Sequence, residues 1–401
     1  MKVRWECVAM RLEPAILRKL NERRVLNALR LGRAQSRTEI QKAVHLTLPT
    51  VSRIVDSLIA QGWVHEVGPA DSALGRPPVL VDIDPSYAVA IGVDLGRKFA
   101  RVVYTNPLAE ILSTTSVPID EVANPAKLAS YLESSVRQHH AILRNLTGVG
   151  IATPAGNPIH HIRNPFHGIA DDPALHWDSA SLIEVVEGRL KLPTWVENDA
   201  NAAALGEIWF GRGQSVSQIV FVLMDVGVGA GIGINGQVYE GARGRAGEFS
   251  DTIVDFRADP CECGCGKRGC VGIVANSAAI QSGVRKVRGD GANLSMSHII
   301  QQAKAGVEPE ASVVSRALDY LSLGVVNLIE IIDPNMVVLG GATLISDPFM
   351  IDEAIRKVRQ FSGTDVPIQV TAFGAQAVAI GAATVVLQHV YDHTRLIENV
   401  T

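Results

Sequence analysis

Apolar residues in the N-terminal part of the chain recur at helical spacing. Between residues 18 and 31 the apolar residues Leu20, Val25, Leu26 and Leu29 recur at roughly this spacing, which predicts a helix. Ser36 then fits an N-cap, with Glu39 completing a capping box for a second helix. Thr47 can cap a third helix, and Pro49 is tolerated in its first turn. The apolar stripe of this third helix consists of Val51, Ile54, Val55, Leu58 and Ile59.

Two short helices joined by a tight turn, the second with small polar groups and an arginine opposite its apolar stripe, are typical of a helix-turn-helix. The second helix of such a motif enters the major groove of DNA. Arg53 can bind either a guanine edge or a phosphate, and the pattern leaves both open. A small helical packing domain is the alternative interpretation. The candidate DNA-binding residues of these helices are Ser36, Arg37, Thr47, Thr50, Ser52 and Arg53.

The segment after the third helix predicts a wing. Gly62 ends the helix, and two strand-like runs at 63–66 and 79–83 flank the sequence Gly-Arg-Pro-Pro. Prolines fix an extended path there, and Arg76 suits a narrow minor groove, whose negative potential attracts arginine. We therefore add Arg76 to the candidates and predict a winged helix-turn-helix DNA-binding domain over residues 1–84.

From residue 85 the pattern changes to β-rich, glycine-punctuated segments that alternate with helices. This pattern is typical of a mixed α/β fold, and 401 residues allow two or three domains. Five clusters of glycine and polar residues carry the candidate chemistry. They lie at 91–98, 148–156, 197–207, 225–233 and 244–251.

Charge is distributed unevenly along the chain. Residues 1–80 hold 13 Lys and Arg against 7 Asp and Glu, a balance of +6, while residues 81–401 have a balance of −10. A basic head on an acidic body favours a polyanionic partner for the head, although an ordinary solvated face would give the same counts. No apolar run approaches the roughly 20 residues of a membrane helix, and charges interrupt the first 17 residues. We expect a cytoplasmic protein, associated with the bacterial nucleoid and without a membrane partner.

Four of the five cysteines crowd into ten residues. A disulfide framework spreads its cysteines along the chain, whereas a cluster of this kind is more often a metal site. The clustered cysteines are Cys261, Cys263, Cys265 and Cys270.

These clusters, in this order, resemble the ROK family of sugar kinases and sugar-responsive repressors. The resemblance covers nearly the whole chain, continues through 333–341 and 380–383, and includes a head like that of the repressor branch, which the kinases lack. It implies an α/β, actin-like (ribonuclease H-like) two-lobed fold behind the head. Lobe 1 would span 85–205, completed by the C-terminal helix at about 385–401, and lobe 2 with a zinc-binding loop would span 206–384.

The two phosphate loops depart from the kinase pattern. In the kinases the first loop resembles D-x-G-G-T-K, and here Arg97 and Lys98 occupy the second glycine and the threonine. In the second loop we assign Val228 to the threonine position. Phosphoryl transfer depends on positioning and charge stabilisation, so we expect no enzymatic activity. Under this interpretation the glycines at 227–233 form a tight turn needed for the fold.

The residues that would contact a sugar agree better with the family pattern than the phosphate loops do. Asp199 matches the catalytic base of the kinases, and without ATP its carboxylate can accept a hydrogen bond from a sugar hydroxyl. Asn198 supplies a donor and an acceptor, although the pair could instead cap the following helix. Glu248 matches another sugar contact of the family, while Asp251 replaces the usual histidine and Gly272 the usual glutamate. The predicted ligand-binding residues are Asn198, Asp199, Glu248 and Asp251.

The resemblance also implies a structural Zn²⁺ ion. Three thiolates of the family match Cys263, Cys265 and Cys270. Structural zinc takes four ligands, and Asp251 or Cys261 can provide the fourth. Together these features predict a repressor that a sugar or sugar derivative releases from a palindromic double-stranded DNA operator, acting as a homodimer or homotetramer. The alternatives are a ROK sugar kinase and a regulator with a vestigial pocket controlled by a protein partner.

Overall fold

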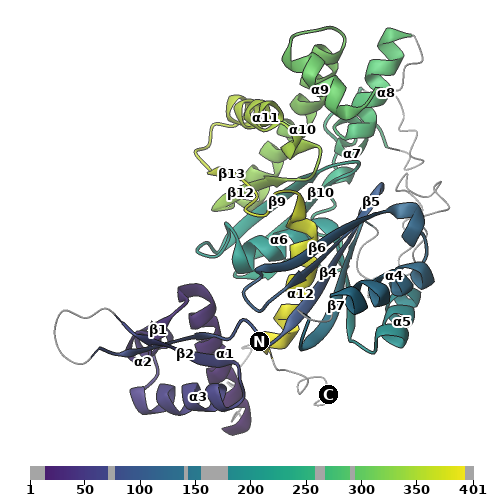
Figure 1. The fold of residues 1–401 in the computed structure, drawn as a ribbon. Coiled ribbons are helices and arrows are strands. Elements are labelled where there is room, and N and C mark those ends of the chain that lie inside the picture. The colour runs from purple at the N-terminus through teal and green to yellow at the C-terminus, as the bar shows by residue number, and fades with distance from the viewer. Residues whose placement is uncertain are drawn as a thin grey trace, which may run out of the picture. The chain divides into compact units, whose positions relative to one another are not determined.

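A computed structural model describes residues 14–70, 77–139, 143–154, 179–257, 267–289 and 294–392 (Figure 1). The chain forms two compact units: residues Met1–Tyr87 together with Leu387–Thr401, and residues Ala88–Val386. The first unit thus extends slightly past the expected head. It also takes the end of the C-terminal helix α12 (Ala377–Asp392), which we had assigned to lobe 1.

The first unit contains the expected helix-turn-helix and wing strands. Its helices are α1 (Pro14–Gly32), α2 (Arg37–Val44) and α3 (Leu48–Ala60). The apolar stripe of α3 is buried except for Ile59, which is half-buried, and Ser36 and Glu39 form the predicted capping box of α2. A three-stranded sheet completes the unit in the order β1-β3-β2, comprising β1 (Gln35–Ser36), β3 (Val79–Ile83) and β2 (Val64–Pro69).

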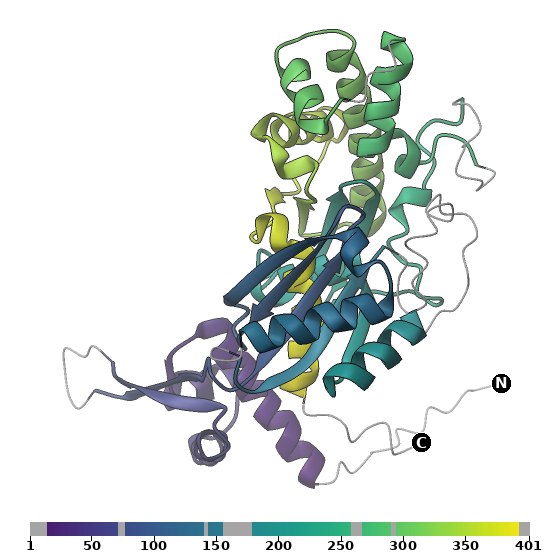
Figure 2. The same ribbon diagram turned by 45° about the vertical axis from the view of Figure 1, so that its right-hand side comes forward.

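The second unit contains two five-stranded sheets, which form the two lobes. The first sheet has the order β6-β5-β4-β7-β8, with β4, β7 and β8 parallel and β5 and β6 antiparallel to their neighbours. Helices α4 (Pro125–Gln138) and α5 (Ser179–Leu190) contribute to the core on one of its faces (Figure 2). Its strands are β4 (Val89–Leu95), β5 (Phe99–Thr105), β6 (Ile111–Pro118), β7 (Leu146–Thr153) and β8 (Thr194–Asn198), with the short helix η1 (Ile119–Val122) after β6.

The second sheet repeats this arrangement in the order β11-β10-β9-β12-β13. Its strands are β9 (Gln218–Met224), β10 (Val228–Ile234), β11 (Gln237–Val238), β12 (Met336–Gly340) and β13 (Ile368–Val370). Its helices are α6 (Asp199–Phe210), α7 (Val271–Val274), α8 (Ser277–Arg288), α9 (Met296–Lys304), α10 (Glu310–Ile332) and α11 (Pro348–Phe361). Three short helices, η4 (Phe249–Asp251), η5 (Leu344–Ser346) and η6 (Gly374–Gln376), lie in its connections.

Glycines let the helices between the two sheets approach the backbone of their neighbours. A Cβ atom on Gly92 or Gly150 would collide with the backbone of α12, and one on Gly381 of α12 would collide with the Ala202 carbonyl of α6. The glycine in the sequence at 380–383 is therefore a packing requirement. It holds α12 and α6 together behind the edge where the pocket forms.

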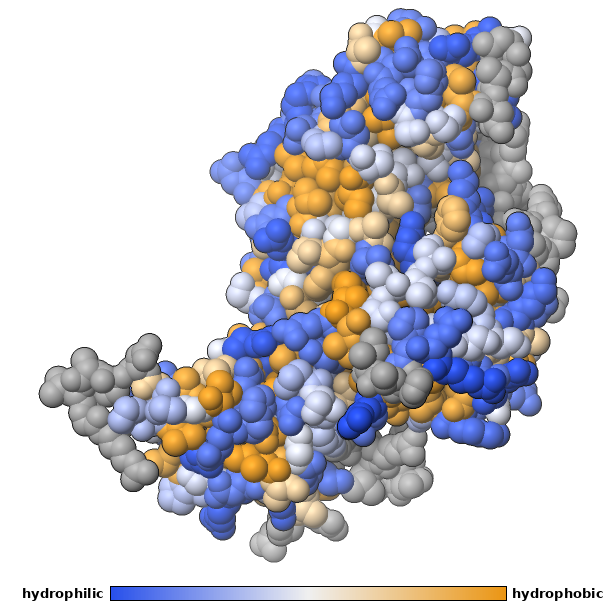
Figure 3. All heavy atoms as spheres, in the orientation of Figure 1, coloured by the Kyte–Doolittle hydropathy of each residue, from blue (hydrophilic) through white to orange (hydrophobic). Residues whose placement is uncertain are grey.

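Helix α10 is apolar because it packs into the core of the second lobe. It is the one described helix long and apolar enough to span a membrane by length and composition. However, Val314, Leu318, Leu321, Val325 and Ile329 are all buried in the core cluster. On the face seen in Figure 3, hydrophobic residues occur as separate patches within a mainly hydrophilic surface.

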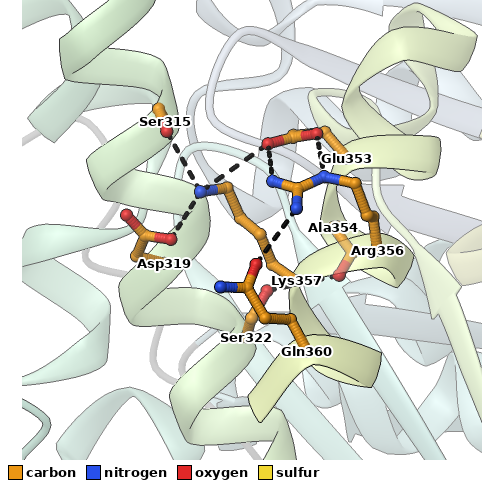
Figure 4. A network of polar contacts seen from close by, with 8 residues as sticks. All are labelled: Ser315, Asp319, Ser322, Glu353, Ala354, Arg356, Lys357 and Gln360. Atoms are coloured by element: carbon orange, nitrogen blue, oxygen red, sulfur yellow. Dashed lines mark hydrogen bonds and ion pairs between the residues drawn. The ribbon is translucent and has the colours of Figure 1, made fainter.

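A buried lysine joins α10 to α11. The Lys357 ammonium donates to the Ser315 hydroxyl at 3.0 Å and to the Asp319 carboxylate, both on α10 (Figure 4). Glu353, one turn earlier on α11, lies 3.6 Å from the same ammonium. Only 6% of the lysine side chain is exposed, so its charge is neutralised inside the helix pair.

Candidate functional site

The exposed face of α3 carries the candidate DNA-reading residues. Arg53 is exposed, and its Nε atom donates to the Pro49 carbonyl at 3.4 Å. Ser52 and Thr50 are half-buried beside it, and the Thr50 and Thr47 hydroxyls lie 2.8 Å apart. Small polar groups around one exposed guanidinium are suited to bind base edges and phosphates.

Two other candidates in the head hold its helices in place. Ser36 is buried, and its hydroxyl accepts from the Glu39 amide and donates to the Glu39 carboxylate. Arg37 donates to the Asp56 carboxylate at 2.9 Å and lies 3.7 Å from that of Glu66. Arg37 thereby connects α2 to α3 and β2. Arg76 lies outside the described residues.

Asp56 of α3 was not among the predicted DNA-binding residues. Its side chain is 64% exposed on the same helix as Arg53, and it is the partner of Arg37. A carboxylate in this place can fix the angle between α2 and α3. It can also accept a hydrogen bond from a cytosine amino group.

The second unit contains a cavity of about 440 Å³ lined by both lobes. The first cluster of the sequence contributes Asp94, Gly96 and Arg97 to its lining. Lys98 is exposed and is not among the lining residues. The four predicted ligand-binding residues Asn198, Asp199, Glu248 and Asp251 all line this cavity.

Asn198 and Asp199 lie at the junction between β8 and α6. The Asn198 side-chain carbonyl accepts from the amides of Ala200 (3.0 Å) and Asn201 (3.1 Å), and so caps α6. One oxygen of Asp199 accepts from the Ala200 amide at 2.8 Å. Asn198 therefore has the capping role considered as the alternative, Asp199 is the first residue of the helix, and both line the cavity. The Asn198 cap uses only the carbonyl oxygen, so its amide group can donate to a ligand.

Carboxylates from distant parts of the chain meet around Asp199. Burial raises the pKa of Asp199 to about 7, and the charges of Asp94, Asp225 and Glu248 add to the rise. Burial also raises the pKa of Asp94 to about 6, against the opposing effect of Arg101, whose guanidinium lies 3.1 Å away. The cavity thus holds part of its acidic residues in the protonated form near neutral pH.

The turn between β9 and β10 differs from the expected phosphate loop in detail. Val228 is the first residue of β10 and is buried in the core, so Val226 is the apolar residue within the turn itself. Asp225 begins the turn, and its carboxylate accepts from the Thr343 hydroxyl at 3.1 Å. The turn itself is therefore Asp225-Val226-Gly227, and Val228, at its end, also belongs to the cavity lining.

The opposite wall contains the two departures noted in the sequence. The Asp251 carboxylate is held by Arg245 at 3.1 Å and by Lys267 at 3.3 Å. A Cβ atom on Gly272 would lie 2.7 Å from the Ser250 Cβ, so a longer side chain cannot occupy this position without a shift of the loop. Both residues still line the cavity.

The cysteine cluster is described only in part. Cys270 is buried, whereas Cys261, Cys263 and Cys265 lie outside the described residues. Among the residues that the structure describes, no group of three His, Cys, Asp or Glu side chains could hold a metal ion.

Comparisons with known proteins agree with this architecture. The ROK family model matches residues 90–389, and a model of the IclR helix-turn-helix domain matches residues 24–68. A xylose repressor from Caldicellulosiruptor bescii is 30% identical over 393 residues, covering 93% of this chain and 96% of the relative. A glucokinase from Halalkalibacterium halodurans is 27% identical over 277 residues, covering 63% of this chain and 79% of the glucokinase.

A solved structure extends the likeness to the complete fold. It is a ROK family transcriptional regulator described as a homologue of the E. coli MLC protein, with a TM-score of 0.76, 24% identity, and coverage of 94% of this chain and 97% of the other. The chain therefore belongs to the ROK family. Because its head carries the helix-turn-helix, it belongs to the branch of that family formed by the transcriptional repressors.

Proposed function

We propose that the protein is a transcriptional repressor whose cavity binds a sugar and whose α3 binds an operator. The observation that carries this proposal is the junction of two features in one chain: an exposed Arg53 on a helix-turn-helix, and a carboxylate-lined cavity centred on Asp199. Neither feature alone separates a repressor from a kinase. Together they connect DNA binding to a small ligand.

The residues of the turn between β9 and β10 do not suit a kinase. A nucleotide phosphate bound by the amides of this turn would meet the Asp225 carboxylate, and like charges repel strongly inside a cavity. Arg97 places a side chain at the first loop, where a close approach of phosphate to the backbone requires glycine. The second candidate function, a sugar kinase, predicts ATP consumption that depends on both the sugar and Asp199.

The charge of the lining favours a neutral sugar. Seven acidic residues and only two arginines, Arg97 and Arg101, line the cavity. Hydroxyl groups can donate to these carboxylates, whereas the phosphate of a sugar phosphate would be repelled. Xylose is the first compound to test, because a relative of matching length is named a xylose repressor.

Sugar binding would act on the operator through a difference in affinity between two states. A ligand shifts a conformational equilibrium only when it binds one state more tightly. Under this proposal the sugar-bound state binds DNA less tightly, so the sugar releases the repressor. We propose that the protein is a homodimer or homotetramer. Its two-fold symmetry would then be matched by two half-sites in a palindromic operator. Its place of action is the cytoplasm, at the nucleoid.

We further propose a structural zinc ion held by Cys263, Cys265, Cys270 and a fourth ligand. Gly269 has a φ of +58° and no room for a Cβ beside Asp255, so the chain turns tightly just before Cys270. The ion pairs of Asp251 with Arg245 and Lys267 favour Cys261 as the fourth ligand over Asp251. When bound, the ion would contribute folding stability to this loop.

Zinc content measured by elemental analysis tests the metal site. Cys265→Ser and Cys261→Ser should lose zinc, while Cys7→Ser, which changes a cysteine outside the cluster, and Asp251→Asn should retain it. Retention by Cys265→Ser contradicts the site. Loss by Asp251→Asn with retention by Cys261→Ser reverses the choice of the fourth ligand.

Selection of genomic DNA fragments on the purified protein, with and without xylose and other sugars, tests the main proposal. We expect enrichment of a palindromic sequence that is lost on addition of one sugar. Enrichment that no sugar alters, together with no thermal shift by any sugar, would favour the regulator controlled by a protein partner. Sugar-dependent ATP consumption abolished by Asp199→Asn would establish the kinase instead.

A further inference from the structure

The chain passes twice between its two units, after Tyr87 and after Val386. Residues from both passages lie in the first unit, where they contact the same side chain, Trp63. This residue is fully buried and lies three positions after Ala60, the last residue of α3. The arrangement brings the recognition helix and both connections to one point.

The backbone of Trp63 ties the end of α3 to the first passage. Its amide donates to the Leu58 carbonyl of α3 at 2.9 Å, and its carbonyl accepts from the Asp84 amide at 2.8 Å. Gly62, with a φ of +80°, makes the sharp turn between the helix and this residue. Trp63 is therefore hydrogen-bonded to α3 on one side and to the segment leading to Tyr87 on the other.

The ring of Trp63 contacts both passages. It stacks on Tyr87 with ring centroids 3.9 Å apart and planes at 25°. Its centroid also lies 5.6 Å from that of Tyr391, near the end of α12 and almost fully buried. An ion pair of 2.8 Å between Asp392 and Arg23 of α1 holds the end of α12 in the first unit.

Helix α12 also takes part in the cavity of the second unit. Its first two residues, Ala377 and Val378, belong to the cavity lining, fourteen and thirteen positions before Tyr391. A change of α12 that accompanies ligand binding therefore reaches Trp63 along one helix. Close-packed aromatic groups respond to such a change by repacking rather than by continuous deformation.

We propose that Trp63 is a positioning residue that makes the placement of α3 depend on the ligand state of the cavity. The inference rests on the proposed function, because it assumes a sugar that alters operator binding. The inference adds to that function the residue through which sugar binding would affect α3. The aromatic cluster of Trp63, Tyr87 and Tyr391 is the element whose packing would differ between the two states.

The test compares operator affinity with and without saturating sugar, and the quotient of the two dissociation constants is the coupling ratio. For the wild type we expect a coupling ratio of roughly 5 to 150, the usual range for allosteric proteins. Tyr391→Ala and Trp63→Leu should bring it to within about twofold of 1, while the sugar dissociation constant in calorimetry stays within about twofold of wild type. Trp63→Phe and Tyr391→Phe keep an aromatic ring and should retain most of the coupling. Val51→Ala, at the other end of α3, should retain it as well.

A spectroscopic measurement covers the case in which a variant does not fold. In protein labelled with 5-fluorotryptophan, the ¹⁹F resonance missing from Trp63→Phe belongs to Trp63. This resonance should move when sugar saturates the wild-type protein. An unmoved resonance, or wild-type coupling in Tyr391→Ala, overturns the inference and leaves the proposed function standing. A wild-type coupling ratio of 1 with every sugar tested overturns both.

Discussion

The DNA-binding helix and the sugar cavity use similar polar residues in opposite surroundings. Around Arg53 the polar groups are exposed or half-buried, and the ion pair of Arg37 with Asp56 joins α3 to α2. Around Asp199 the acidic groups line a cavity and repel one another, and burial raises the pKa of both Asp199 and Asp94. The difference suits the ligands: a polyanion is met by exposed positive charge, whereas a neutral polyol is enclosed by acceptors of hydrogen bonds.

The strongest test of this comparison removes the exposed guanidinium. Arg53→Ala should weaken operator binding by about 1–3 kcal/mol, roughly 5- to 150-fold, if Arg53 binds a base edge. Sugar binding should be unchanged. Fluorescence anisotropy on the selected operator measures the effect, with Arg144→Ala, an exposed arginine of the second unit, as control. Equal affinities for Arg53→Ala and wild type would mean that α3 does not bind DNA through this residue.

Neutralising the carboxylate of Asp199 tests the sugar cavity, the second region of the comparison. Asp199→Asn should weaken sugar binding about 10- to 150-fold, because a hydrogen bond to a charged group contributes about 1.5–3 kcal/mol. Operator binding without sugar should remain, and release of the DNA should require a correspondingly higher sugar concentration. Isothermal titration calorimetry provides the measurement, and Asp352→Asn on the exposed face of α11 is the control. Unaltered sugar affinity in Asp199→Asn would place the ligand elsewhere.

The raised pKa of Asp199 predicts a pH dependence of smaller size. A sugar hydroxyl donates to the ionised carboxylate, so binding favours the deprotonated form and the affinity should rise with pH through about 7. Between pH 6 and pH 8 the ionised fraction, and with it the association constant, should increase about tenfold. The same dependence should be absent from Asp199→Asn. An affinity that falls over this range would show that the ligand binds the protonated acid.

Folding stability responds to the same group with the opposite sign. The pKa of Asp199 in the folded protein, about 7, lies above its ordinary value, so the folded state binds more protons at intermediate pH. The free energy of unfolding should therefore decrease as the pH rises from about 4 towards 7. Urea denaturation at pH 5 and pH 7 should show a smaller difference for Asp199→Asn than for wild type. Equal differences would contradict the assignment of this effect to Asp199.

The smallest expected effect concerns the lysine between α10 and α11. Lys357→Met keeps the apolar part of the side chain but leaves Ser315 and Asp319 without their shared donor. Asp319 is 42% exposed and can return to water, so the free energy of unfolding should fall by only about 1 kcal/mol. Differential scanning calorimetry should show a Tm lower by about 2–4 °C. Sugar and operator affinities should not change, which separates this structural network from both binding regions.

Local features of the fold were accessible from the sequence. The capping box of Ser36 and Glu39 and the stripe of α3 depend on residues within one or two helical turns, so periodicity predicts them directly. The two-lobed fold was predicted through resemblance, by the order of the glycine clusters. The junction at Asn198 and Asp199 was also found, because it lies within one motif.

Contacts between distant residues were not accessible. Asp94 and Asp225 are separated by a large part of the chain, and their shared effect on the pKa of Asp199 requires the folded cavity. The partners of Arg37 and the place of Tyr391 in the first unit depend in the same way on tertiary packing.

The close approach of α12 to its neighbours restricts the kind of motion this helix can make. Carbonyl groups of α12 face the bare Cα positions of Gly92 and Gly150, and Gly381 in turn faces the Ala202 carbonyl of α6. Sliding α12 along its axis by one residue would bring methyl groups onto these carbonyls. These contacts all lie in the first half of α12, between Ala379 and Ala383, so a substitution that enlarges any of the three glycines would displace this half of the helix first.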